Sequence, residues 1–76
     1  MTVTLEDEEY LAAAKKRALA YLPHDPPQAF TSMLRDMTKN PHFENHVGNR
    51  MGIGLMIVPG WISNPREVRR WIEGYR

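Results

Sequence analysis

Three Asx-Pro pairs divide this chain of 76 residues, and they constrain its fold more than any other feature. Proline is accepted in the first turn of a helix because its missing N–H would have no partner there, and a preceding Asp or Asn caps the free amides of that turn. The pairs are Asp25-Pro26, Asn40-Pro41 and Asn64-Pro65, and Glu67 after the last pair can complete a capping box. They predict helices that begin near residues 26, 41 and 65.

A further helix is predicted ahead of these three, over residues 5–22. Thr4 can cap it, the acidic residues that follow suit the positive end of a helix dipole, and Pro23 ends it. Three of the four segments carry apolar residues at helical spacing, which is typical of a face that packs on a core. The stripes are Leu11, Ala14, Ala18 and Leu22; Phe30, Met33, Leu34 and Met37; and Val68, Trp71, Ile72 and Tyr75.

The segment from Met51 to Trp61, MGIGLMIVPGW, contains no charge and three glycines. One helical face of this region carries Val47, Met51, Gly54 and Val58. From Ile53 onward the other faces become apolar too, and a helix that is apolar all round is typically buried all round. Gly48, Gly52 and Gly54 would each cost about 1 kcal/mol relative to Ala, which is tolerated where a neighbouring backbone comes close. A strand over residues 53–58 is the competing interpretation, but the sequence offers no second strand to pair with it.

These patterns predict an all-α fold, a compact bundle of four helices over about 5–22, 26–38, 41–58 and 65–75, with the third helix central and buried. Residues 1–76 form a single domain. A chain of this size buries only about 60% of the surface that its unfolded form exposes, so a partner subunit would add stability. The sequence has no cysteine, no basic leader and no apolar run long enough to cross a bilayer, which favours a soluble cytoplasmic protein without a membrane partner.

Aromatic residues outside the main stripes are the first candidates for a binding surface. We expect a domain this small not to bury Phe30, Phe43, Trp61 and Trp71 together, so that part of this surface meets a partner. Aromatic side chains are also common anchors at protein interfaces. The partner-binding residues predicted on this basis are Trp61, Ile62, Tyr10 and Tyr21.

The basic face of the last helix supports an alternative. Arg66, Arg69 and Arg70 lie opposite its apolar stripe, as in the recognition helices of small DNA-binding proteins. A net charge of only +1 and the interspersed glutamates favour a solvated face instead.

His42 and His46 have the i, i+4 spacing that lets two imidazoles share a metal on a helix. A third ligand and a recognisable catalytic constellation are both lacking, so we predict no metal, no cofactor and no enzymatic activity.

Residues 29–76 resemble small helical proteins of unassigned function from actinobacterial phages. The resemblance rests on the order of the helices, on Asn40-Pro41, on the glycine-rich apolar run and on the ending Arg69-Arg70-Trp71-Ile72-Glu73-Gly74-Tyr75. It implies a phage-encoded protein that acts in the cytoplasm of the bacterial host, as an accessory to growth or host takeover, and it implies no catalytic residue. The sequence therefore predicts a non-enzymatic protein–protein interaction module that forms a homo-oligomer, such as a homodimer, or binds a host protein; a small DNA-binding regulator is the alternative.

Overall fold

Each helix of the protein begins at a side chain that caps its first turn. The computed structural model describes residues 4–76, which form four helices and no strand: α1 (Leu5–Tyr21), α2 (Pro26–Thr38), α3 (Val47–Met56) and α4 (Pro65–Glu73). Thr4, Asp25 and Asn64 accept hydrogen bonds from backbone N–H groups at the starts of α1, α2 and α4. The predicted starts of these three helices are confirmed, and their ends agree with the prediction to within two residues.

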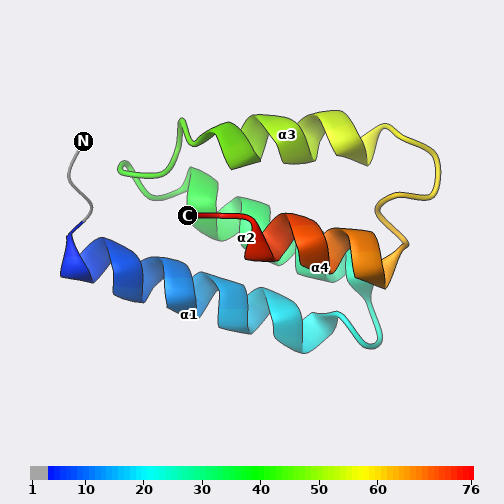
Figure 1. Cartoon of the computed structure of the whole chain (residues 1–76), viewed down its shortest axis with the longest axis horizontal. Helices are drawn as coiled ribbons and strands as arrows, with labels where there is room; N and C mark the ends of the chain where they lie inside the picture. Colours follow the sequence, from blue (N-terminus) through cyan, green and yellow to red (C-terminus); the bar gives the residue numbers. More distant parts are fainter. Residues whose placement is uncertain (1–3) are drawn as a thin grey trace.

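The antiparallel pair of α1 and α2 is the most extensive helix contact in the molecule (Figure 1). Ala14 and Ala18 of α1 are completely buried, and side chains of this size let two helices approach closely. A polar link crosses the same pair, since Arg17 Nε donates to the buried carboxylate of Asp36 at 3.0 Å. Tyr10 adds a hydrogen bond from its hydroxyl to the Asp36 carbonyl at 2.6 Å.

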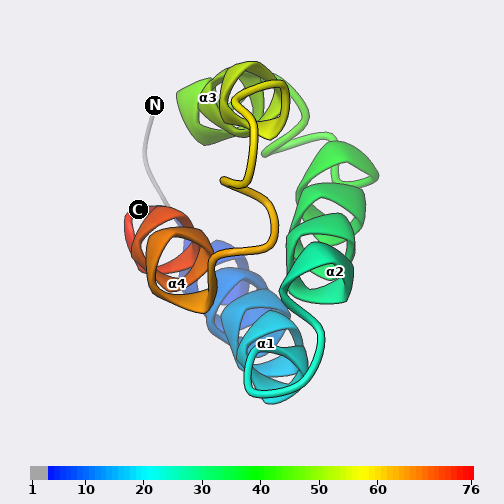
Figure 2. The same ribbon diagram turned by 90° about the vertical axis from the view of Figure 1, so that its right-hand side faces the viewer.

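The centre of the molecule is filled by side chains from α1, α2, α4 and a connecting segment. Figures 1 and 2 together show the chain between α3 and α4, residues 57–64, crossing one end of the bundle. It carries Trp61 against Phe30, whose ring centre lies 5.7 Å from that of Trp61 and 4.8 Å from that of Trp71. The buried apolar side chains are Ala14, Ala18, Leu22, Ala29, Phe30, Met33, Met37, Phe43, Trp61, Val68, Trp71, Ile72 and Tyr75.

The predicted position of the third helix as the central, buried element is wrong. No apolar side chain of α3 belongs to the buried core, and the helix lies at the rim of the bundle (Figure 2). Its buried residues are Gly48, Asn49 and Gly52, which have little or no apolar side chain to fill a centre. Aromatic side chains from α4 and Trp61 fill it instead, because the glycines leave room for them.

The third helix also begins at residue 47 rather than 41. The Asn40 side chain accepts from the His42 N–H at 2.8 Å, which makes a local turn instead of a helix cap. Two further turns follow, closed by hydrogen bonds from Phe43 to Asn40 and from His46 to Phe43, each 2.9 Å long. The buried side-chain amide of Asn49 donates to the Phe43 and Glu44 carbonyls, so these carbonyls are hydrogen-bonded without the backbone N–H groups that a helix would supply. The helix cap is His46, whose Nδ1 accepts from Gly48 N–H.

The all-α fold with four helices is confirmed, although its internal arrangement differs from the prediction. Among residues 4–76, none of the helices combines the length and the apolar character that crossing a membrane requires.

Candidate interaction surface

The outer side of α3 is a nearly uncharged apolar surface, which we call the α3 face. It carries the four residues predicted to share one helical side, Val47, Met51, Gly54 and Val58, but these point to solvent rather than to the core. Ile57 is 79% exposed and Val47 is 63% exposed. The α3 face consists of Val47, Arg50, Met51, Ile53, Gly54, Ile57 and Val58.

The inner side of α3 makes hydrogen bonds to Trp71 and Tyr75, and its glycines leave room for their rings. Trp71 Nε1 donates to the Gly48 carbonyl at 2.9 Å, and the Tyr75 hydroxyl donates to Asn49 Oδ1 at 2.6 Å. A Cβ atom at Gly52 would lie 2.5 Å from the Trp71 ring, so this glycine is required for the indole to fit. A surface helix normally turns its apolar side to the core, and α3 has the opposite arrangement.

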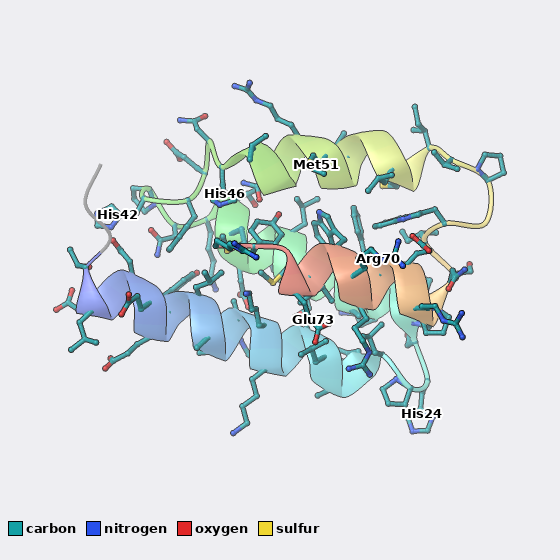
Figure 3. All side chains as sticks on the ribbon, viewed as in Figure 1. His24, His42, His46, Met51, Arg70 and Glu73 are labelled. Carbon is teal, nitrogen blue, oxygen red and sulfur yellow. The ribbon has the colours of Figure 1, made fainter. Side chains whose placement is uncertain are left out.

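A groove lies between α3 and α4, beside the α3 face. Its volume is about 270 Å³. Figure 3 shows Met51 on α3 and Arg70 on α4 at the two sides of this space. Val47 and Met51 belong both to the groove and to the α3 face, so the two apolar surfaces are continuous. The rest of the lining includes Leu55, Trp61, Trp71 and Tyr75, with Glu67 and Arg70 as charged residues.

The residues predicted to bind a partner differ in how far they are exposed, and Trp61 is buried. Trp61 is only 8% exposed, and Phe30, Phe43 and Trp71 are buried as well, so the expectation that the chain cannot bury all four rings is wrong. The turns before α3 place Phe43 in the core, and the connection after α3 places Trp61 there. Both residues lie outside the helices, so the apolar stripes of the helices did not predict their burial.

The other three predicted residues do not form one surface with Trp61. Ile62 is half-buried against the core, and Tyr10 is half-buried with its ring 6.0 Å from that of Phe43. Tyr21, at the far end of α1, is exposed. These positions form no continuous exposed surface, whereas the residues of the α3 face do.

Arg66, Arg69 and Arg70 are all exposed on α4, as the alternative interpretation requires. Arg70 lies 3.9 Å from Glu67, and it also borders the groove. This pair reduces the positive charge that the helix presents to a phosphate backbone.

The two histidines do not share a helical face, because both precede α3. His46 accepts at Nδ1 from Gly48, and its Nε2 donates to the Arg76 carbonyl at 2.9 Å. His42 Nδ1 lies 2.6 Å from Asp7 Oδ1, and this hydrogen bond lowers the pKa of the Asp7 carboxyl below its ordinary value of 3.8. No cluster of three or more His, Asp or Glu suited to a metal occurs within residues 4–76. The histidines therefore fix the ends of helices: His46 caps α3, and His42 contacts the capping box of α1.

Sequence reasoning missed Asn49 as a residue of interest, and it predicted a close neighbour at Gly54. Asn49 is buried and satisfied through three hydrogen bonds, with Phe43, Glu44 and Tyr75. Gly54 is exposed, and a Cβ atom there would meet nothing within 4 Å. A polar residue among glycines in an apolar helix was the available signal for Asn49.

Comparisons with family models, curated proteins and solved structures found no match to this chain. The resemblance of residues 29–76 to phage proteins stays a prediction.

Proposed function

We propose that this protein is a non-enzymatic protein–protein interaction module and that it binds its partner through the α3 face. The observation that carries this proposal is the inverted arrangement of α3, in which Gly48, Asn49 and Gly52 face inward and most of the large apolar side chains face outward. Exposed apolar side chains cost free energy in an isolated soluble protein, and contiguous patches of this kind are typical of interaction sites.

The attachment of α3 supports the same conclusion. Two hydrogen bonds and two aromatic rings from the end of α4 hold the inner side of this helix, and among its aliphatic side chains Leu55 alone packs partly against the core. The α3 face is therefore presented on a fixed element, and binding would order little additional chain. Preorganisation of this kind lowers the entropic cost of association.

Site-specific photo-crosslinking tests the proposal. A photoreactive amino acid is introduced in place of Arg50, in the middle of the α3 face, and, as a matched control, in place of Lys16, which is exposed on α1. In cells that express the protein, we expect covalent adducts from position 50 and few from position 16. The proposal is wrong if position 50 gives no more adduct than position 16.

DNA binding through Arg66, Arg69 and Arg70 is the alternative. It predicts binding to duplex DNA that weakens steeply with salt and is lost in an Arg66→Ala/Arg70→Ala variant. The net charge of +1 and the contact between Arg70 and Glu67 favour the interaction module.

A further inference from the structure

We propose that the partner of the α3 face is a second copy of this chain, and that the two α3 helices pack antiparallel and cross at Gly54. This inference rests on the proposed function, because it needs the α3 face to be a binding surface. It adds the identity of the partner, the direction of the two helices and the residue at their crossing.

Gly54 is the first observation. The three glycines of α3 differ in what surrounds them: Gly48 and Gly52 leave room for the rings of Tyr75 and Trp71, whereas a Cβ atom at Gly54 would meet nothing within 4 Å among residues 4–76. Glycine inside a helix is unfavourable relative to alanine, and no contact within the described residues requires it at this position. Close approach of another helix is the common reason for such a glycine, and Gly54 lies in the α3 face, where that helix would come from outside.

Charge selects a direction for the two helices. Arg50 is the only charged residue between Val47 and Val58. In a parallel pair the two Arg50 side chains would lie side by side and repel each other. In an antiparallel pair centred on Gly54, Arg50 lies at the level of Val58 of the second copy, so the two arginines are separated by about 12 Å along the helices. Each arginine then lies near the C-terminal end of the other α3, where the helix dipole is negative.

The α3 face is complementary to itself in this arrangement. A twofold axis perpendicular to the two helices places the row of Val47, Met51 and Val58 along the same row of the second copy. Ile53 and Ile57 lie on the other flank of the crossing, each on the same side as its counterpart in the second copy.

The exposed apolar side chains of the α3 face are what such a pair would bury. Each partner of a standard interface buries roughly 800 Å², and the face offers Val47, Met51, Ile53, Ile57 and Val58, which are 48–79% exposed. Contacts near the groove would bring the buried area closer to that size. A small chain with a limited core gains stability from this burial.

Sedimentation velocity over a range of concentrations is the first test, on the wild type, on Ile57→Glu and on Leu5→Glu. Both substitutions place an acid at an exposed aliphatic position, but only Ile57 belongs to the α3 face. We expect a concentration-dependent dimer for the wild type and for Leu5→Glu, and only monomer for Ile57→Glu. Circular dichroism checks that all three proteins keep their helices.

Cysteine trapping tests the direction of the pair, because the chain has no cysteine of its own. In a glutathione redox buffer, we expect the double variant Arg50→Cys/Val58→Cys to form a disulfide-linked dimer, because position 50 lies at the level of position 58 of the second copy, and Arg50→Cys alone to stay reduced. A parallel pair predicts a disulfide in Arg50→Cys alone, since it brings the two residues at position 50 together.

The outcomes separate this inference from the proposed function. A strict monomer in sedimentation, or a disulfide-linked dimer of Arg50→Cys alone, overturns the antiparallel pair. If the protein is monomeric while photo-crosslinking at position 50 yields an adduct with a different protein, the self-pairing is wrong and the interaction module stands. An adduct of twice the mass of the chain supports both.

Discussion

At the scale of single residues, the glycines of α3 have opposite roles that substitution would reveal. Gly52→Ala places a Cβ atom 2.5 Å from the buried Trp71 ring, which cannot move without losing its hydrogen bond to Gly48. We expect a loss of about 1–3 kcal/mol in the free energy of unfolding, as for other overpacked cores. Gly54→Ala meets nothing and removes the unfavourable glycine, so it should stabilise the monomer by about 0.5–1 kcal/mol. Urea denaturation at low protein concentration measures both, and equal effects would contradict the assigned contacts.

Tyr75 makes the free energy of unfolding depend on pH in the alkaline range. Burial raises the pKa of its hydroxyl above the ordinary value of 10.0, because the folded protein disfavours the tyrosinate. The stabilisation is therefore complete below 10.0 and is lost as the pH rises above that value. Tyr75→Phe leaves Asn49 Oδ1 without its hydroxyl donor, which costs about 1–3 kcal/mol at neutral pH, and should flatten the alkaline decline. Denaturation across this pH range, with the exposed Tyr21→Phe as control, checks the expectation; an unchanged decline in Tyr75→Phe would contradict it.

At the scale of elements, Asn49 connects α3 to the turns before it and to the end of α4. Its side chain donates to the Phe43 and Glu44 carbonyls and accepts from Tyr75. Asn49→Ala leaves buried polar groups unpaired on both sides, which we expect to cost roughly 2–4 kcal/mol. Hydrogen exchange should show the amides of α3 losing protection more than those of α1. Uniform loss across the molecule would mean that α3 does not open as a separate unit.

The elements also differ in how far the sequence predicted them. The caps and apolar stripes of α1, α2 and α4 lie within the helices themselves, so local spacing was sufficient. For α3, Asn40-Pro41 looked like the same signal, but Asn40 closes a turn and His46 caps the helix. Nothing local distinguishes the two outcomes, because the carbonyls of the turn are satisfied by Asn49, several residues later.

At the scale of the whole molecule, Trp61, in the connection between α3 and α4, packs between α2 and α4 in the core. Its indole packs against Phe30 and Trp71, with ring centres 5.7 Å and 6.1 Å away. Trp61→Ala would leave a large cavity between the helices, with an expected cost of about 3–5 kcal/mol. This is a large share of the stability of a small domain. Thermal unfolding should show a much lower Tm, whereas Tyr21→Ala, at an exposed site, should change it little. A small change in Tm for Trp61→Ala would show that the Trp61 ring contributes little to the packing of the core.

The sequence by itself determined that this protein is helical, where three of its helices begin and which of their sides form the core, because caps and apolar spacing act over one or two turns of chain. Only the tertiary structure decided which way α3 faces. That choice depends on Trp71 and Tyr75, whose rings occupy the space beside Gly48 and Gly52 although they lie far along the chain from them. α3 itself carries apolar residues on most of its sides, so its own sequence fits either orientation. The contacts with residues of α4 and the chain after it place most of the aliphatic side chains of α3 on the outside.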